Sequence, residues 1–458
     1  MTARSADARG RLSPVPAVAG RAATAPYVPR RPKISNRTKY TFPFVAVLAF
    51  AIVEYGRPQD WLPFLNAAHP GVIVLGMCMV ALVLYPRARI PGLVKYMFVF
   101  LAFMALGIPF AYNNHYALMY TKDMALLLVA GVVPIAIFVD NFPKMRTFFR
   151  FWVLVQVPVT LYALTHHGRG VGSFLGDEND FCLLSNMAAP YSFFLLSVAT
   201  SRLEKWFLGG TLALFITGSI ASFSRGGFLG LLATGVFCWL RSPRKLVAAF
   251  VILLIAGVGF LYSSDKYWKE MGTIKTSTNR NDTGWERLYL WGIAWRMFLD
   301  HPIMGVGPGN YQYESFKYED PREGWRGEHI WGKVAHSLYF TALSEGGIIG
   351  SVLYLGILVA GWRARVRIRK KYRQIMRSGV PPPPFRERLR TIYYLTLALD
   401  GSLIAFLVTG AFIAVLYYPH LWLLTAFTAV VQRIFQETAR EAEQPDVTPP
   451  SVAAVAAS

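Results

Sequence analysis

Long apolar blocks alternate with short charged or turn-rich stretches along most of the 458-residue chain. A membrane-spanning helix needs about 20 predominantly apolar residues, so each block of roughly that length predicts a span. The pattern therefore predicts an all-α, polytopic membrane helix bundle. We expect about twelve spans, at 41–55, 71–85, 93–111, 124–139, 147–164, 181–200, 206–222, 226–240, 246–262, 337–361, 391–416 and 419–435.

The composition excludes other broad classes of protein. Hydrophobic residues make up 54% of the chain and charged residues only 16%, whereas soluble domains carry about 25% charge. An aromatic content of 15% excludes disorder for the bulk of the chain. The three cysteines all lie inside apolar blocks, which argues against a secreted disulfide scaffold.

The formal net charge of +21, from 47 Lys and Arg against 26 Asp and Glu, is distributed unevenly. Most of the basic residues fall in the 1–40 tail, in alternate short connections and in the 362–390 connection. This alternation is the positive-inside pattern, so we expect both termini to be cytoplasmic. The 362–390 stretch suits a cytoplasmic loop near anionic lipid. Nucleic-acid binding is the other interpretation, and no nucleic-acid-binding fold signal accompanies it.

These features divide the chain into five parts. We expect a disordered basic tail at 1–40, a first membrane block of about nine spans at 41–262 and an outer loop subdomain at 263–335. A last block of about three spans follows at 336–436, with the basic loop 362–390 inside it, and a disordered tail at 437–458.

The 263–335 loop is far longer than a connection requires, so we expect it to fold. Leu288, Trp291, Trp295 and Phe298 recur at helical spacing, which predicts an amphipathic helix. The glycine-rich segment GVGPGN at 305–310 predicts turns after it. A phosphate-binding loop is the sharper interpretation, but the spacing matches neither the Walker nor the dinucleotide pattern.

Four segments, in order, resemble the O-antigen ligase/polymerase superfamily of bacterial membrane glycosyltransferases. Each is a weak signal alone, but four in order at the predicted outer face are specific for the superfamily. One departure is Ser337, where the family often has Asn after the histidine. The segments are GSFLGDENDFCLLSNMAAP at 172–190, SFSRGGFLG at 222–230, ERLYLWGIAWRMFLDHPIMGVGPGNY at 286–311 and AHSLYFTALSEGGIIG at 335–350.

The resemblance implies metal-independent, inverting transfer of a glycan from an undecaprenyl-diphosphate carrier to an acceptor hydroxyl, without a cofactor. It also implies the bacterial inner membrane, with the active site on the periplasmic face. Arginine suits a diphosphate because its contacts are bidentate and permanently charged. Histidine suits removal of a proton from a hydroxyl at neutral pH.

Three residues carry the main hypotheses. Arg225 lies between two apolar blocks beside two glycines, and we expect it to bind the donor diphosphate; otherwise it is an arginine reaching the membrane surface. Arg287 is a second candidate diphosphate ligand, or else the partner of a loop carboxylate. His336 is the expected general base or acceptor-positioning residue, unless it merely begins a helix at the interface.

Five further residues are possible substrate contacts. Arg57 and Arg169 are outer-side arginines, and a solvated loop charge is the favoured interpretation of Arg169. Asn179 and Asp180 either bind sugar hydroxyls or cap the next helix. Glu345 follows His336 by nine residues, which would place the two on opposite sides of a straight helix.

Asp400 lies inside an apolar span, and an intramembrane acid is a functional hypothesis by default. We favour a buried hydrogen bond to a neighbouring helix. The other histidines have no metal-ligand spacing, so we expect no metal site.

Several functional alternatives stay open. Within the enzyme class, the acceptor is a lipid core, another glycan repeat or, for an O-linked oligosaccharyltransferase, a protein. A lipid-linked glycan transporter or flippase is the alternative of a different class, although no internal repeat supports it. A non-catalytic membrane scaffold is a third class, and it would not require His336 or the arginines.

Overall fold

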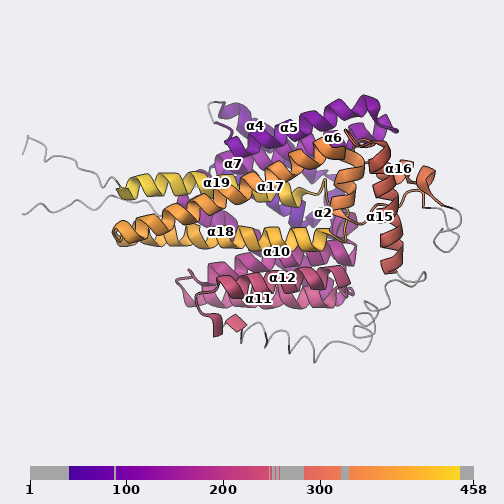
Figure 1. Ribbon diagram of the computed structural model, residues 1–458. Helices are drawn as coiled ribbons and strands as arrows, with labels where there is room; N and C mark the ends of the chain where they lie inside the picture. Colours follow the sequence, from indigo (N-terminus) through magenta and orange to yellow (C-terminus); the bar gives the residue numbers. More distant parts are fainter. Residues whose placement is uncertain are drawn as a thin grey trace, which may run out of the picture. The chain divides into compact units, whose positions relative to one another are not determined.

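Helices form the regular structure of the computed structural model, which describes residues 41–86, 89–246, 283–320 and 330–443 and isolated positions between 248 and 257 (Figure 1). No strand occurs in these described residues, which confirms the all-α prediction. The 1–40 tail, most of the predicted 246–262 span, 258–282 and 321–329 of the outer loop, and 444–458 lie outside the described residues.

Most helices overlap the predicted spans, but the helix predicted at 124–139 begins ten residues earlier, at Asn114. Two of the longer ones contain a π-helical turn, at η1 (Ile52–Gly56) and η3 (Leu128–Val132). The main helices are α1 (Phe42–Ala51), α4 (Pro70–Leu84), α5 (Gly92–Gly107), α6 (Asn114–Leu127), α7 (Val133–Phe138), α8 (Phe142–Thr165), α10 (Glu178–Leu196), α11 (Arg202–Ala221), α12 (Arg225–Arg241), α15 (Thr283–Asp300), α17 (Leu338–Ser378), α18 (Pro383–Gly410) and α19 (Pro419–Glu443). Short helical turns are α2 (Pro58–Trp61), α3 (Pro63–Ala67), η2 (Ile108–Phe110), α9 (Gly172–Leu175), α16 (Tyr311–Glu314) and η5 (Ser315–Tyr318).

Five helical segments in the described part are long and apolar enough to cross a membrane. These are Gly92–Phe110, Asn114–Phe138, Phe142–Thr165, Leu338–Ser378 and Pro383–Gly410. The chain is thus a multi-pass membrane protein. Other predicted spans coincide with helices that are shorter or more polar, such as α12 and α19, so the count of twelve stays a prediction.

The interior forms where α10 and α18 meet, with α11 and α12 on one side and α17 and α19 on the other. Small residues allow this close approach. A Cβ atom on Gly230 of α12 would lie 1.9 Å from the Thr409 hydroxyl of α18. Asn186 of α10 donates to the Gly227 carbonyl of α12 at 2.8 Å, so the buried polar groups here are shared between helices.

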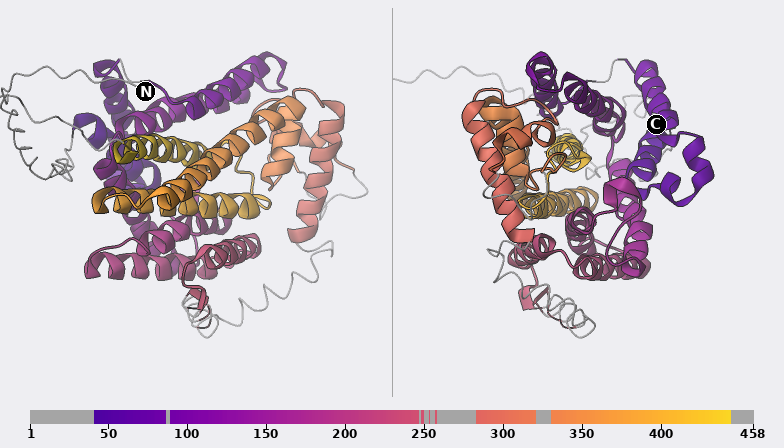
Figure 2. Two further views of the ribbon diagram at one scale, coloured as in Figure 1. Left: turned by 60° about the vertical axis from the view of Figure 1, so that its left-hand side comes forward. Right: turned by 90° about the vertical axis from the view of Figure 1, so that its right-hand side faces the viewer.

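A kink divides α17 at Gly347, whose backbone is left-handed with φ 58°. The kink leaves room for the chain that follows α15, because a Cβ on Gly347 would lie 2.5 Å from the Ile303 carbonyl oxygen. The Ile348 amide donates to Pro302 at 2.8 Å. As a result α15 packs against α17 and crosses the ends of the long helices (Figures 1 and 2).

The basic stretch at 362–390 corrects one prediction, because most of it is helix and not loop. Helix α17 continues to Ser378, and α18 begins at Pro383. Two of its arginines turn inward: the Arg365 Nε and Arg369 Nη1 atoms lie 2.6 and 2.7 Å from the Asp400 carboxylate. Asp400 therefore joins a buried ion cluster, a stronger contact than the simple hydrogen bond that we predicted.

The C-terminal helix also corrects a boundary. Helix α19 continues to Glu443, into the range 437–458 that we predicted to be disordered. Thr438 and Ala439 are buried, and Glu443 pairs with Lys371 of α17 at 2.7 Å. Packing against the extended α17 explains the additional helical turns.

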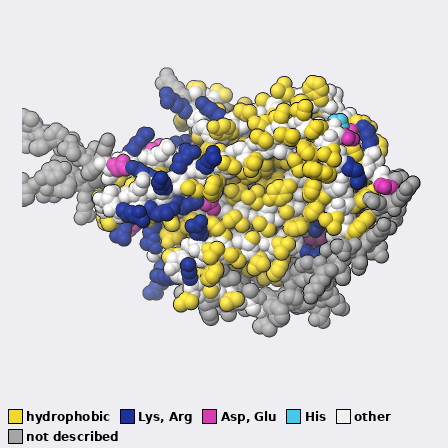
Figure 3. Space-filling model, in the orientation of Figure 1, with side chains coloured by type: hydrophobic (Ala, Val, Ile, Leu, Met, Phe, Trp, Pro, Cys, Tyr) yellow, Lys and Arg dark blue, Asp and Glu magenta, His cyan; other side chains and the backbone are white. Residues whose placement is uncertain are grey.

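Hydrophobic side chains cover the middle of the described surface, and Lys and Arg gather toward the end where α17 meets α18 (Figure 3). The two ends of α17 thus differ from each other in the charge of their surroundings. The part of α17 after the kink, 348–378, is about 47 Å long, whereas the hydrocarbon core of a bilayer is about 30 Å thick.

Candidate active site

A cavity of about 860 Å³ lies beside the N-terminal half of α17. Its walls come from α1 and η1, α4, α6, the start of α10, the glycine-rich segment after α15, and the connection between α18 and α19. Five of the eight predicted site residues line it: Arg57, Asn179, Asp180, His336 and Glu345. The structure therefore brings together residues from distant parts of the chain.

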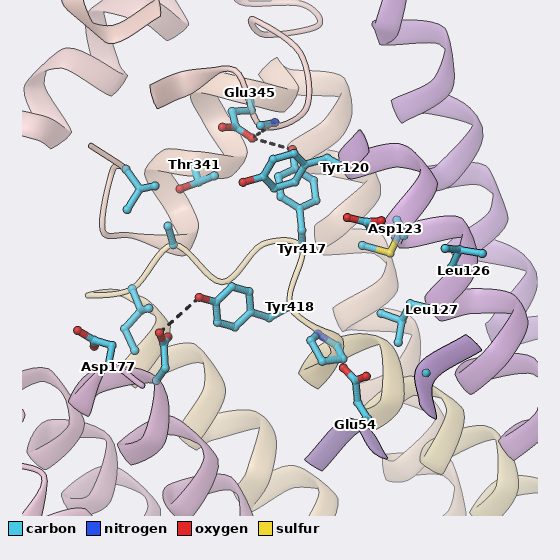
Figure 4. A pocket seen from close by; sticks show the side chains of 18 of the residues that line it. Glu54, Tyr120, Asp123, Leu126, Leu127, Asp177, Thr341, Glu345, Tyr417 and Tyr418 are labelled. Carbon is cyan, nitrogen blue, oxygen red and sulfur yellow. Dashed lines mark hydrogen bonds between the residues drawn. The ribbon is translucent and has the colours of Figure 1, made fainter. Parts of the chain in front are cut away.

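The cavity is amphipathic. One wall is apolar, with Val72 and Leu75 from α4 and Leu126 and Leu127 from α6. The rest carries tyrosines and carboxylates, several of which project into the space shown in Figure 4. This combination suits a ligand that has both an apolar and a polar, hydroxyl-rich part. The polar set comprises Glu54, Tyr120, Asp123, Asp177, Asp180, Tyr311, Glu345, Tyr417 and Tyr418.

His336 is half-buried, and its backbone is left-handed with φ 46°. The preceding residue, Ala335, is fixed because it packs into a small apolar cluster with Leu290 and Ile293 of α15. Burial lowers the pKa of His336 from its ordinary value near 6.5, and the positive charge of Arg287 lowers it further. The imidazole is therefore neutral at physiological pH and able to accept a proton.

Arg287 lies in the first turns of α15, half-buried, and its charge acts on His336. The neighbouring Glu286 pairs with Lys333 at 2.7 Å. This pair ties the start of α15 to the segment that leads into His336. Arg287 itself is absent from the cavity lining, although its charge reaches the residue that we predicted as the base.

Arg225 is the first residue of α12 and is half-buried. Ser224 caps the helix by accepting a hydrogen bond from the Gly227 amide at 2.9 Å, and its hydroxyl donates to Asn179 Oδ1 at 2.7 Å. Phe223, just before, has a left-handed φ of 55°. Arg225 does not line the cavity, but Asn179 does. The Ser224 side chain therefore connects the start of α12 with a residue of the cavity wall.

Asp177 caps α10, whereas Asn179 and Asp180, the caps that we predicted, do not. Its Oδ1 atom accepts from the Asn179 amide at 2.8 Å. Asp180, which we predicted as a sugar contact or a cap, is instead buried and lines the cavity. Its Oδ2 atom accepts a hydrogen bond from the Tyr418 hydroxyl at 3.4 Å. Burial raises the pKa of Tyr418, so that its hydroxyl stays protonated and donates.

Glu345 holds the glycine-rich segment in place. Its carboxylate accepts from the amides of Gly309 at 2.8 Å and Tyr311 at 3.1 Å, and from the Tyr417 hydroxyl at 2.8 Å. The backbone donors that a phosphate-binding loop would offer at these two positions are therefore occupied by a carboxylate. His336 precedes α17, so the helical spacing that we applied to it and Glu345 does not hold, and both line one cavity.

The remaining arginines differ in their surroundings. Arg57 lines the cavity with a left-handed backbone, φ 49°, and its Nε pairs with Asp60. Arg169 is exposed and pairs with Glu178 at 3.1 Å, as expected for a loop charge. Left-handed residues often lie at functional sites. Arg57 and His336, which line the cavity, share this conformation with His69, His167 and Phe223, which do not line it.

Sequence reasoning missed Tyr417 and Tyr418. These neighbours lie in the connection between α18 and α19 and reach two different carboxylates, on α17 and α10 (Figure 4). The sequence gives one hint, a pair of tyrosines directly before Pro419 at a predicted span boundary. Their partners are more than 70 residues away, so their role emerges only from the fold.

Residues 210–355 match the family model for O-antigen ligase. This segment, about a third of the chain, is thus similar to the O-antigen ligase domain. The match confirms the superfamily that the four motifs predicted, and it includes Arg225, Arg287, His336 and Glu345. Arg57, Asn179 and Asp180 lie outside the matched range. A search of curated proteins found no match.

The O-antigen ligase domain and the apolar helices together support a membrane glycosyltransferase of the O-antigen ligase type, in a multi-pass bacterial membrane protein. The family implies a lipid-linked glycan as substrate.

Proposed function

We propose that this O-antigen ligase-type protein transfers a glycan from undecaprenyl diphosphate to an acceptor hydroxyl at the periplasmic face of the inner membrane. The observation that carries the proposal is the single cavity that combines His336, Arg57 and buried carboxylates with an apolar wall. A lipid-linked glycan has the same two parts, because its polyprenyl chain is apolar and its sugars carry hydroxyls.

The base in this reaction is His336. Its neutral imidazole takes the proton of the acceptor hydroxyl as the hydroxyl oxygen attacks the anomeric carbon. The bond from that carbon to the diphosphate oxygen breaks, and the diphosphate leaves with the electron pair. Attack opposite to the leaving group inverts the anomeric configuration.

The leaving group is bound by arginines. Arg225 and Arg287 are the proposed diphosphate ligands, and Arg57 adds a charge within the cavity. Guanidinium groups offer forked donors that match phosphate oxygens and neutralise the charge that develops. We propose that no metal ion takes part.

The orientation rests on the two ends of α17. His336 directly precedes this helix, and the basic side chains of 363–377 lie toward its other end. The helix is longer than a bilayer core, so the two ends project on opposite sides. With the basic end in the cytoplasm, the cavity opens at the periplasmic side.

Reconstitution tests the proposal. Purified protein in liposomes is supplied with an undecaprenyl-diphosphate-linked glycan and, in turn, a lipid core, a second lipid-linked repeat or an acceptor protein. We expect a glycosylated product with one acceptor class, released undecaprenyl diphosphate, and unchanged rates in the presence of a metal chelator. Translocation of the glycan lipid without any product would instead indicate a flippase.

A further inference from the structure

The Asp180 carboxylate has one oxygen that the protein leaves open. Asp180 is 7% exposed and lines the cavity. Tyr418 donates to its Oδ2, but Oδ1 has no hydrogen-bond partner among the described residues. A buried carboxylate oxygen without a donor is costly, so a donor from a ligand in the cavity would be favourable.

Capping does not explain this residue. Asp177 already caps α10, with its Oδ1 accepting from both the backbone and the side-chain nitrogen of Asn179 at 2.8 Å. Asp180 is thus dispensable for starting the helix. Glu345, a second buried carboxylate in the same cavity, has hydrogen bonds to both of its oxygens. The open oxygen of Asp180 is therefore not a general property of this cavity.

We propose that Asp180 Oδ1 accepts a hydrogen bond from a hydroxyl of the sugar that is attached to the donor diphosphate. Burial raises the pKa of Asp180 to about 7, so the carboxyl accepts from a hydroxyl when ionised and can also donate to one when protonated. The next side chain along, Asn179, is bonded to Ser224, which directly precedes Arg225. Asp180 is therefore one residue along α10 from a side chain that contacts the residue before Arg225, so the sugar next to the diphosphate is the one that we assign to this oxygen.

Tyr418 completes the subsite. Its hydroxyl donates to Asp180 in a long hydrogen bond of 3.4 Å, and the residue lines the same cavity (Figure 4). Aromatic rings supply a rigid apolar face next to a polar tip, which suits a sugar that has both apolar and hydroxyl-bearing faces. Asp180 and Tyr418 would together recognise a sugar, while the arginines recognise the diphosphate that all such carriers share.

The inference rests on the proposed function. A comparison of two lipids distinguishes a failure of the sugar contact from a failure of the proposed function. Binding of undecaprenyl diphosphate and of the same lipid carrying its glycan is measured for wild type, Asp180→Asn and Asp180→Ala in detergent. We expect both variants to lose about 10–100-fold in affinity for the glycan lipid, as for one hydrogen bond to a charged group. Affinity for the sugar-free lipid should change less than about twofold.

Glu443→Gln is the matched control, because this carboxylate is half-exposed on α19 and does not line the cavity, and the variant should bind both lipids as wild type does. Asp180→Asn keeps the shape of the side chain and guards against misfolding, which a thermal unfolding curve checks. Equal losses for both lipids, or no loss for either, would overturn the sugar contact. If wild type binds neither lipid, the proposed function fails as well.

Discussion

The two ends of α17 both bury charged side chains but satisfy them differently. Toward its C-terminal end, Arg365 and Arg369 hold Asp400 at 2.6 and 2.7 Å, and only Nη2 of Arg365 in this cluster has no hydrogen-bond partner among the described residues. Toward its N-terminal end, His336 and Asp180 line a cavity, and Asp180 keeps an oxygen open. Burial of charge is therefore not enough to identify a reactive site. The informative feature is a buried polar atom without a partner that also lines a cavity, as Asp180 Oδ1 does and Arg365 Nη2 does not.

The strongest way to break this comparison is His336→Ala. If the cavity end carries the chemistry, removing the base should lower the transfer rate by about 10²–10⁴-fold. The unfolding temperature should hardly change, because His336 is only half-buried and precedes the helix. Initial rates with the lipid-linked donor, alongside a melting curve, measure both. Undiminished transfer would remove His336 from the reaction.

Asp400→Ala should have the opposite signature. It leaves Arg365 and Arg369 as buried charges without their carboxylate, and such losses cost about 3–5 kcal/mol of folding free energy. We expect a large drop in the unfolding temperature but normal transfer per folded molecule. Glu443→Gln is the control, since it breaks the half-exposed pair with Lys371 and should cost less than about 1 kcal/mol. Normal stability of Asp400→Ala would contradict a structural cluster.

Arg225→Lys tests whether a guanidinium is needed at the cavity end. An ammonium keeps the charge but loses the forked contact, so donor affinity should fall by about 10–100-fold. Arg169→Lys provides the comparison, because Arg169 is exposed and already paired with Glu178. Its change should leave donor affinity within about twofold. Similar results for both arginines would mean that Arg225 only anchors the start of α12.

The helices themselves were predictable because spans depend on local composition. The structure departs from the sequence patterns where distant residues decide the outcome. The sequence pattern predicts that Arg365 and Arg369 are loop charges. In the fold, both pair with the buried Asp400 of another helix. The kink at Gly347 cannot be recognised from the local sequence, since glycine occurs often in membrane helices and the segment that requires the kink precedes α17 by about 35 residues.

The site residues likewise fall into those that local sequence identifies and those that only the fold brings together. His336, Arg225 and Arg287 stand in short motifs, so a resemblance over a few residues was enough to select them. The pairing of Tyr417 with Glu345 and of Tyr418 with Asp180 has no motif, because each pair joins helices that meet only in the folded bundle. The same holds for Asp177, whose capping role frees Asp180 for the cavity.

The smallest expected effect is a shift in pH dependence. Burial and the charge of Arg287 lower the pKa of His336, so the neutral, proton-accepting imidazole persists below pH 6.5. With donor at saturating concentration, so that protonation of Asp180, whose pKa burial raises to about 7, does not limit binding, the rate should stay level from neutral pH down past 6.5. It should fall only in more acidic buffer, where His336 becomes protonated. Arg287→Gln removes a positive charge and should move this fall to higher pH.

Glu286→Gln should do the reverse, because the Glu286 carboxylate raises the pKa of His336 while Arg287 and Lys333 lower it. Opposite shifts from two adjacent residues of α15 are hard to explain by a loss of folding or of donor binding, which would lower the rate at every pH. If the transfer rate of both variants fell at the same acidic pH, a group other than His336 would be responsible for the fall. The contrast between the two ends of α17 would then rest on the open oxygen of Asp180 alone.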